Sequence, residues 1–326
     1  MAQVETTNVR VEISTAHYRT AVTSKASSAS ERKVPMIALA LLALSAAEDY
    51  DLLVVGGGSG GIACAREAAA LGARVCVADY VRPSPAGSRW GLGGTCVNVG
   101  CIPKKLMHRA AQLGEMVATD APAYGWRLER VGADGSGRGT AHDWRALVKL
   151  VQGHIKSLNF GYRSALAKEG VTYLNRRASF RSATEVALAD ASGDESLVRA
   201  KHVVLAVGGR PNFPDGFAGA AARCISSDDL FSLTEPPGKT LVVGGSYVAL
   251  ECAGLLRGLG FDVTLLMRSI PLRGFDVDCA RRVLEALKDE GVEVRPSSEP
   301  ASIHAILAPT NRWLDLGFIS ARSPRR

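Results

Sequence analysis

The sequence has no apolar run long enough to cross a membrane. Its longest such run, residues 34–47, has fourteen residues, whereas a transmembrane helix needs about 20. Cysteine is also scarce, because 7 cysteines in 326 residues are too few and too scattered for a disulfide scaffold. We therefore expect no membrane span, and a fold held by a hydrophobic core to which the 47% hydrophobic residues contribute.

Two binding functions also lack their usual residues. The net charge of +7 suits nucleic-acid binding, but the basic residues are dispersed and no basic run contains interleaved aromatic residues. A structural zinc site needs four ligands, usually in two pairs, and the sequence has a single close cysteine pair and no histidine pair with ligand spacing. We expect neither a nucleic-acid partner nor a bound metal.

That single pair is Cys96 and Cys101, in the stretch GGTCVNVGCIPKK. Five residues rise about 7.5 Å in a helix and roughly 17 Å in a strand, but the Cα atoms of a disulfide lie about 4.4–6.8 Å apart. A bond between the two cysteines would therefore need a turn of the backbone, which Gly93, Gly94 and Gly100 permit.

Pro103 favours the first turn of a helix, which would place Cys101 at or just before the helix N-terminus. The helix dipole and the charges of Lys104 and Lys105 would then favour a thiolate. The pair is thus a candidate redox dithiol, and a purely structural disulfide is the alternative. The other cysteines each lie in an apolar pattern and are expected to be buried: Cys64, Cys76, Cys224, Cys252 and Cys279.

From residue 51 onward the sequence has the pattern of a βαβ unit that binds a dinucleotide. An apolar strand, Asp51–Val55, is followed by the glycine fingerprint G-x-G-x-x-G, an alanine-rich helix over 62–71 and a second strand over 74–78. The helix N-terminus would bind a pyrophosphate, and an acid after the second strand would bind a ribose. The residues expected at this site are Gly56, Gly58, Ser59, Gly60, Gly61, Asp79 and Tyr80.

The pattern repeats 188 residues later, where the string LVVGG recurs at 241–245. In the repeat, Ser246 and Ala249 replace two of the glycines, and Met267 replaces Asp79. An acid at that position favours a free ribose hydroxyl, whereas arginines favour a 2′-phosphate through charge-assisted hydrogen bonds. The polar residues that follow are Arg268, Ser269 and Arg273. The first unit therefore suits FAD and the second NADPH, the alternative being that the arginines belong to a solvated charged loop.

Between the two units the pattern predicts a surface insertion, a helix and several strands. The insertion is expected over 119–140, the helix over His142–Lys168, and the strands over 171–174, 185–189 and 201–207, with a turn at 192–194.

The first nucleotide unit, the CxxxxC pair and the second nucleotide unit together resemble the pyridine nucleotide-disulfide oxidoreductase family. Four strings resemble its large, animal-type thioredoxin reductases: WGLGGTCVNVGCIPKKLMH, SSDDLFSL, GKTLVVGGSYVALECAG and RSIPLRGFD. The string PSPAG, together with IPLRGFD, is more similar to the mitochondrial form than to the cytosolic one. The resemblance extends from about Asp49 to Val294 and implies an α/β fold with two Rossmann-like dinucleotide-binding domains.

By this resemblance NADPH would reduce FAD, FAD would reduce a Cys96–Cys101 disulfide, and the dithiol would reduce thioredoxin. Cys96 would be the outer, interchange thiol and Cys101 the inner thiol next to the flavin. Lys104 and Glu251 would pair near the flavin ring, and Tyr247 would gate the nicotinamide. The other cofactor contacts that the resemblance implies are Gly94, Thr95, Gly208, Ser246, Val248 and Ala249.

Four regions are expected: a leader over 1–47, an FAD domain with the redox disulfide over 48–211, an NADPH domain over 212–294, and a tail over 295–326 without strand alternation. The leader is either disordered or a targeting segment, so a mitochondrial location is expected, with a cytoplasmic one as the alternative.

The family continues into an interface domain that carries a His-Glu dyad and forms the family's homodimer, and then into a C-terminal redox tail, and these residues have no counterpart of either. We therefore expect a chain that lacks the interface domain and turns over poorly. The alternatives are a non-catalytic dinucleotide-binding fragment and an enzyme resembling glutathione or lipoamide reductase.

Overall fold

The computed structural model describes residues 48–126, 142–213, 224–307 and 312–320. Residues 301–307 and 312–320 are described by their backbone alone. The expected leader over 1–47 and most of the expected insertion therefore lie outside the described residues. Within the described residues no helix is long and apolar enough to cross a membrane.

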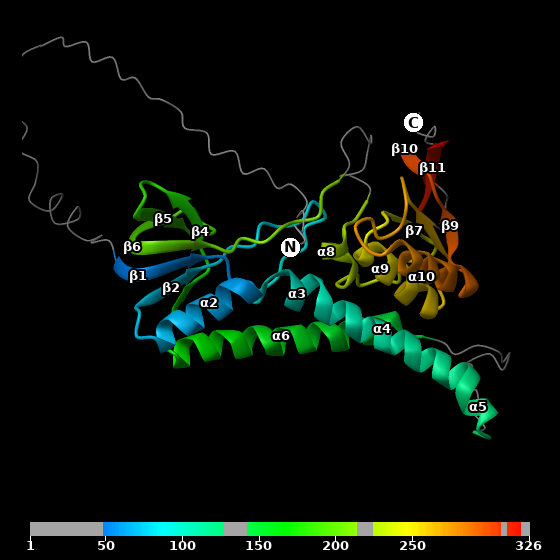
Figure 1. Ribbon diagram of the computed structural model, residues 1–326, viewed down its shortest axis with the longest axis horizontal. Coiled ribbons are helices and arrows are strands. Elements are labelled where there is room, and N and C mark those ends of the chain that lie inside the picture. The colour runs from blue at the N-terminus through cyan, green and yellow to red at the C-terminus, as the bar shows by residue number, and fades with distance from the viewer. Residues whose placement is uncertain (1–47, 127–141, 214–223, 308–311, 321–326) are drawn as a thin grey trace, which may run out of the picture.

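A six-stranded sheet forms the first unit (Figure 1). Parallel pairing joins β3, β2, β1 and β6, and antiparallel pairing adds β5 and β4 at the far edge. In spatial order the strands are β3 (Thr172–Leu174), β2 (Val75–Ala78), β1 (Glu48–Val55), β6 (Glu195–Leu205), β5 (Glu185–Ala189) and β4 (Arg177–Phe180). The predicted α/β class with a Rossmann-like parallel sheet is confirmed.

Strand β1 is buried on both faces, because successive side chains point to opposite sides of a strand. On one face Val54 packs with Ile62 of α2 (Ser59–Ala70) and Leu166 of α6 (Trp144–Lys168). On the other face Leu53 packs with Leu188 of β5. This double burial explains why the second half of β1, residues 52–55, is continuously apolar in sequence instead of alternating.

Three predicted boundaries shift in the structure. Helix α2 begins at Ser59, three residues before the predicted start, because the fingerprint glycines form its first turn. Helix α6 begins at Trp144, because the Asp143 side chain accepts a hydrogen bond from the Ala146 amide at 3.0 Å and caps the helix there. Strand β6 begins at 195, six residues before the prediction, because it already pairs with β5.

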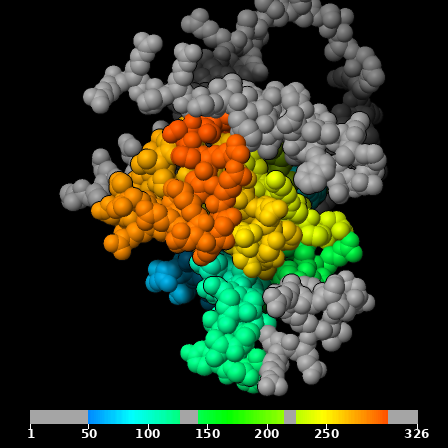
Figure 2. Space-filling view, turned by 90° about the vertical axis from the view of Figure 1, so that its right-hand side faces the viewer, coloured from blue at the N-terminus to red at the C-terminus, as the bar shows by residue number. Residues whose placement is uncertain are grey.

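Four helical segments follow one another after the first nucleotide unit. They are α3 (Gly94–Val99), α4 (Cys101–Glu115) and the π-helical η1 (Met116–Asp120), and the short α5 (Ala121–Ala123) completes the run. Figure 2 shows the end of this run projecting from the body of the molecule. The prediction that the insertion starts at residue 119 was wrong for its first residues, since 119–123 are helical.

A three-stranded parallel sheet forms the second unit, in the order β7, β8, β9. The elements are β7 (Thr240–Val243), α9 (Tyr247–Gly258), β8 (Val263–Leu266), α10 (Val277–Asp289) and β9 (Glu293–Arg295), preceded by the short helix α8 (Ser227–Leu230). The predicted repeat of strand, glycine turn, helix and strand is therefore present.

The expectation that no strands follow Val294 was wrong. Strands β10 (Ser298–Leu307) and β11 (Arg312–Ser320) form an antiparallel hairpin, seen beside the second sheet in Figure 1. The register of the hairpin shifts between Pro300 and Ser302. Since proline cannot donate to a strand ladder and is tolerated at such irregularities, Pro300 obscured the pattern in sequence without preventing the pairing.

Helices α4 and α6 pack with the second unit in one hydrophobic core. It contains Met107 of α4, Val151 of α6, Leu255 of α9 and Leu265 of β8, each with a relative exposure of 0%. Where α4 meets α9, a side chain at Gly258 would place its Cβ 2.8 Å from that of Ala111, so the helices touch closely. Because Leu166 of α6 also packs with β1, the first and second units are held together through α4 and α6.

The cysteines outside the CxxxxC pair only partly follow the prediction. Cys76 and Cys252 are buried, and Cys64 and Cys224 are half-buried. Cys279 is exposed on α10, so the prediction was wrong there. Cys279 lies in the first turn of α10, between the exposed Asp278 and the buried Ala280, so its position on the helix leaves it at the surface.

Two neighbouring glycines of the fingerprint allow a matched test of the fold. A Cβ at Gly61 would lie 1.9 Å from the Gly56 carbonyl oxygen, whereas a Cβ at Gly60 would meet nothing within 4 Å. We expect Gly61→Ala to reduce the free energy of unfolding by about 2–3 kcal/mol. We expect Gly60→Ala to leave it unchanged or raise it by up to about 1 kcal/mol. Urea unfolding midpoints measure both, and equal midpoints would contradict this account of the turn.

Candidate redox site

Cys96 and Cys101 are joined by a disulfide, with their Cα atoms 4.6 Å apart. Cys96 lies in α3, and Cys101 is the first residue of α4. A Cβ at Gly100, between the two helices, would lie 2.9 Å from the Thr95 carbonyl oxygen, so the reversal of direction needs a glycine. The structure thus has both the predicted turn and the predicted position of Cys101 at a helix N-terminus.

The exposures of the two cysteines do not follow the predicted order of an outer Cys96 and an inner Cys101. Cys101 is exposed and Cys96 is half-buried. The assignment of Cys96 as the outer thiol and Cys101 as the inner one therefore stays a prediction. Thr95, before Cys96, is exposed in the first turn of α3.

The glycine fingerprint contacts the start of α3 directly. The Gly93 amide donates a hydrogen bond to the Gly57 carbonyl at 2.9 Å, and Gly58 and Gly93 form an isolated parallel bridge. A Cβ on Gly94 would lie 2.6 Å from the Gly58 Cα. The nucleotide-binding turn and the redox helix are therefore packed backbone against backbone.

The first βαβ unit has the features that the ADP half of a dinucleotide needs. Its helix α2 begins after Gly58, whose position provides no side-chain cap for the first amides. Ser59 and Gly60 in that first turn are exposed. An uncapped, accessible helix N-terminus is a favourable site for a pyrophosphate, so the residues present fit FAD.

Asp79 lies at the carboxyl end of β2, and its Oδ1 accepts a hydrogen bond from the Gly57 amide at 2.9 Å. Burial raises the pKa of Asp79 and outweighs the hydrogen bond from Gly57, which lowers it. Asp79 thus orients the glycine turn, and its predicted contact with a ribose stays a prediction. Tyr80 follows it and is 40% exposed. Gly208, after β6, is exposed and has a φ of 64°.

The predicted pair of Lys104 and Glu251 is present, and it links α4 to α9. The Lys104 ammonium forms an ion pair with Glu251 Oε2, and Lys105 lies 3.5 Å from Glu251 Oε1. The Tyr247 ring lies 4.8 Å from the Lys104 nitrogen, which makes a cation–π contact. Lys104 is 5% exposed, so it depends on these partners for its charge.

The charge of Lys104 determines the direction of the Glu251 pKa shift, whereas burial determines the direction of the Cys252 pKa shift. Burial would raise the pKa of Glu251, but the hydrogen bond and charge of Lys104, with a smaller effect of Lys105, hold this pKa below its usual value. Burial raises the pKa of Cys252 to about 12. Cys252 is therefore a packing residue and not a second reactive thiol.

Two asparagines that the sequence analysis missed hold the redox segment in place. The buried amide of Asn98 donates to the carbonyls of Gly91 at 3.1 Å and Gly94 at 2.8 Å, and its oxygen accepts from Asn159 of α6 at 2.9 Å. Asn98 is 2% exposed. The only available sequence signal was a polar residue inside the otherwise apolar turn VNV, between the cysteines.

The second unit differs from the first in the three places that the sequence indicated. The Ser246 hydroxyl accepts from the Ala249 amide at 3.4 Å and caps α9. Met267 replaces the acid and is 1% exposed. A Cβ at Gly245 would lie 3.4 Å from its sulfur, so Met267 fills the space under the turn. Val248 is half-buried in the first turn of α9, whose start fits a second nucleotide less closely.

The predicted 2′-phosphate readers lie together after β8. Arg268, Ser269 and Arg273 are all exposed. The Leu272 amide donates to the Gly245 carbonyl at 2.7 Å, which folds this segment back over the glycine turn. Arg268 forms an ion pair with Glu299, with a distance of 3.5 Å between Nε and Oε1. The arginines are thus next to the turn, as a nucleotide with a 2′-phosphate would require.

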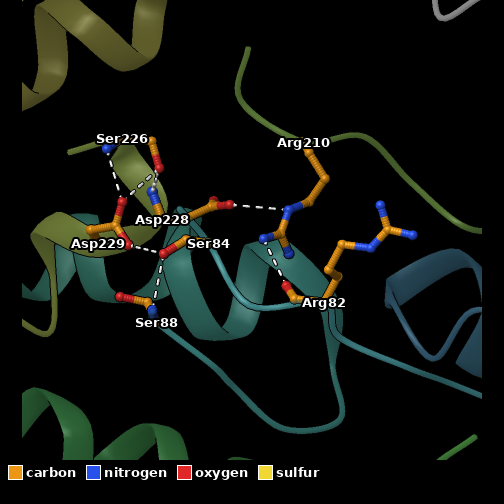
Figure 3. Close-up of polar contacts among 7 residues, drawn as sticks. All are labelled: Arg82, Ser84, Ser88, Arg210, Ser226, Asp228 and Asp229. Atoms are coloured by element: carbon orange, nitrogen blue, oxygen red, sulfur yellow. Dashed lines mark hydrogen bonds and ion pairs between the residues drawn. The ribbon is translucent and has the colours of Figure 1, made fainter. Parts of the chain in front are cut away.

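A buried carboxylate fastens the segment after Tyr80 to the linker helix α8 (Figure 3). Asp229 accepts hydrogen bonds from the Ser84 hydroxyl and, at 2.9 Å each, from the Ser226 amide and hydroxyl. The pKa of Asp229 is low because the hydrogen bonds of Ser84 and its neighbours outweigh the effect of burial. Asp229 and Ser84 therefore connect parts of the chain that are 145 residues apart.

The adjacent carboxylate, Asp228, points the other way, toward Arg210 (Figure 3). Its Oδ2 lies 3.4 Å from the Arg210 Nε, and Arg210 also donates to the Arg82 carbonyl at 2.9 Å. The Arg210 guanidinium lies 4.3 Å from the centre of the Trp90 ring. Burial raises the pKa of Asp228, which is 2% exposed. These contacts fix the loop that leads into the redox segment.

Residues 50–305 match the sequence profile of the pyridine nucleotide-disulphide oxidoreductase family. This chain belongs to that family. The match extends to residue 305, into β10, and so continues past Val294, where the resemblance had been expected to end.

Relatives within the family include large thioredoxin reductases. The chain is 51% identical over 263 residues to thioredoxin reductase SEP1 of Emiliania huxleyi. The matched residues make up 80% of this chain and 51% of that protein. The chain is 50% identical over 246 residues to a thioredoxin reductase of Plasmodium falciparum isolate FCH-5, covering 75% of this chain and 44% of that protein. The chain thus spans about half the length of these relatives or less.

The pair of Lys104 and Glu251 predicts a specific loss of stability. In Glu251→Gln the buried Lys104 loses its counter-charge, so we expect a loss of about 1–3 kcal/mol in the free energy of unfolding. The loss should be smaller than for a fully buried pair because Glu251 is 36% exposed. The matched control is Glu235→Gln, which removes an exposed partner of Arg145 and should cost less than about 0.5 kcal/mol.

The pH dependence of this loss follows from the low pKa of Glu251. A carboxylate with a depressed folded-state pKa stabilises the protein above its ordinary value of 4.5, and the stabilisation disappears as the pH falls through the folded-state pKa. The difference between the original protein and Glu251→Gln should therefore be largest near neutral pH and shrink in acid. Urea titrations from about pH 3 to 7.5 test this, and a difference that stays constant or grows below pH 4.5 would refute it.

Proposed function

We propose that this chain is the nucleotide-binding and dithiol part of an NADPH-dependent flavoprotein disulfide reductase that reduces thioredoxin. The observation that supports it best is the placement of the disulfide between the two nucleotide units. On one side α3 contacts the fingerprint turn through Gly58 and Gly94, and on the other α4 pairs with α9 through Lys104 and Glu251. Nucleotides held at the two units would therefore both lie on the side of the chain that carries the Cys96–Cys101 disulfide, which would be the group they reduce.

FAD, when bound, supplies the chemistry that converts a hydride from NADPH into electrons for the disulfide. The chain itself supplies positions and charges. Cys101 is the first residue of α4, where the positive end of the helix dipole favours its thiolate. The balance is simple: NADPH and one proton provide the two electrons and two protons that turn the Cys96–Cys101 disulfide into two thiols.

Lys104 contributes a fixed positive charge one helical turn from Cys101. Glu251 and the Tyr247 ring hold its ammonium on the side of α4 that faces α9. Because Lys104 is 5% exposed, this charge is screened little by solvent and favours negative charge that develops nearby during reduction. The exposed Tyr247 at the start of α9 is placed to cover an entering nicotinamide.

Thioredoxin is the proposed acceptor because both relatives described above are thioredoxin reductases. The recognition of NADPH is proposed from Arg268 and Arg273, which follow Met267, the residue that stands in the place of Asp79. A glutathione-type acceptor would suit the same dithiol, and the acceptor assay below separates the two.

The dithiol proposal predicts NADPH-dependent thiols at two defined positions. After reconstitution with FAD, the protein should show flavin absorbance, and NADPH should make Cys96 and Cys101 available to iodoacetamide, as peptide mass spectrometry can detect. Cys101→Ser should abolish the NADPH-dependent labelling of Cys96, because no disulfide can form. The matched control is Cys279→Ser, an exposed cysteine outside the disulfide, which should change nothing.

Failure to take up flavin at saturating FAD would overturn this proposal. If the thiols appear, oxidation of NADPH with oxidised thioredoxin and, separately, with oxidised glutathione then identifies the acceptor. Faster oxidation with glutathione would contradict the choice of thioredoxin.

The cofactor proposal predicts that Arg268→Ala and Arg273→Ala each weaken the binding of NADPH much more than the binding of NADH. Each change should cost about 1.5–3 kcal/mol for NADPH, since a charged hydrogen bond to the phosphate is lost. The matched control is Arg281→Ala on α10, whose guanidinium pairs with Asp278 at 2.8 Å. Titration calorimetry with both nucleotides measures the effect, and equal losses for NADPH and NADH would show that the arginines do not bind the 2′-phosphate.

A further inference from the structure

Glu299 occupies the position next to Arg268, and the backbone fixes it there. The Met267 amide donates to the Arg295 carbonyl at 3.0 Å, and the Ser298 amide donates to the Met267 carbonyl at 3.0 Å. Residues on either side of the turn at 296–297 therefore bond to the backbone of Met267, Arg295 before the turn and Ser298 after it. This register places residue 299 beside residue 268, independently of either side chain.

The turn itself is specified by the fold. Ser297 has a φ of 49°, a left-handed conformation that costs a non-glycine residue roughly 1–2 kcal/mol. Such a conformation persists only where the surrounding hydrogen bonds require it. The contact between β10 and the end of β8 is therefore a built feature, and Glu299 at its start is held within reach of Arg268.

Glu299 pairs with Arg268, while the nearby acid Glu293 has other partners. Arg268 Nε lies 3.5 Å from Glu299 Oε1, with side-chain exposures of 68% and 49%. The other acid on this edge, Glu293, is occupied by Arg295 at 2.6 Å and by Thr264 at 3.0 Å. Glu299 is thus the carboxylate that faces the proposed 2′-phosphate position.

We propose that Glu299 sets the nicotinamide preference of the second site by competing with the 2′-phosphate for Arg268. This inference rests on the proposed function, in which Arg268 and Arg273 bind that phosphate. A carboxylate and a phosphate cannot both have the same guanidinium edge without repelling each other, so NADPH must displace Glu299 from Arg268. NADH has no phosphate there and leaves the ion pair intact. Glu299 therefore weakens the binding of NADPH but not of NADH, and so reduces the preference of the site for NADPH.

The size of the effect follows from the exposure of the pair. Exposed ion pairs contribute up to about 1 kcal/mol, which corresponds to a change of about fivefold in an equilibrium constant. Because a 2′-phosphate carries up to two negative charges, removing the charge of Glu299 should strengthen NADPH binding by about three- to tenfold at low salt. The gain should decrease as salt is added.

Binding of 2′,5′-ADP and of ADP to the whole chain tests this proposal without flavin or turnover. Titration calorimetry should show that Glu299→Gln binds 2′,5′-ADP about three- to tenfold more tightly and ADP within twofold of the original protein. The unchanged ADP affinity would show that the site is still folded. The matched control is Glu285→Gln, which removes the same charge from α10, where the carboxylate faces Arg281. This control should leave both affinities unchanged.

A double variant connects the effect to Arg268. In the Arg268→Ala background, Glu299→Gln should change the affinity for 2′,5′-ADP by no more than the Glu285 control does. An unchanged or weaker affinity of Glu299→Gln for 2′,5′-ADP, with a normal loss in Arg268→Ala, would overturn the inference alone. If Arg268→Ala and Arg273→Ala do not distinguish 2′,5′-ADP from ADP, the proposed NADPH site fails instead, and this inference fails with it.

Discussion

The backbone contact between Gly58 and Gly94 determines where the disulfide lies. A single methyl group on Gly94 would come within 2.6 Å of the Gly58 Cα, so α3 can begin at this position only if residue 94 is a glycine. Because α3 carries Cys96 and leads directly to Cys101, the contact holds the disulfide next to the uncapped start of α2. A binding turn and a redox group thus share one junction in which backbone packs directly against backbone.

The second unit reaches the same junction through packing and charge. Helix α4 continues from Cys101 into the core that it shares with α9, and the close approach of Ala111 and Gly258 sets the separation of the two helices. Near the start of α4, Lys104 and Glu251 complete the contact with an ion pair whose lysine is buried and whose carboxylate is 36% exposed. Burial of apolar side chains in this core supplies most of the stability, and the ion pair adds a contact of opposite charges between the two helices.

Local pattern predicted the parts of this structure that depend on neighbouring residues. The strand, glycine turn and helix of each unit followed from periodicity and from the repeat of LVVGG, and the disulfide turn followed from its glycines. The Asn98 to Asn159 contact joins residues 61 apart and the Ser84 to Asp229 contact residues 145 apart, so no local signal identified them. The hairpin of β10 and β11 was missed for a related reason, because its strands are stabilised by each other and Pro300 interrupts the first.

The two nucleotide units differ in ways that match two different kinds of cofactor. In the first, the helix start is free of side-chain caps and Asp79 is fixed by the Gly57 amide, so backbone groups with little freedom would make the main contacts. In the second, Ser246 already caps α9 and a buried Met267 fills the place of the acid, which leaves recognition to exposed arginines. Contacts from exposed charges are weak and salt-sensitive, whereas contacts from a preorganised backbone are not. A nucleotide that stays through many turnovers suits the first arrangement, and one that must leave after each hydride transfer suits the second.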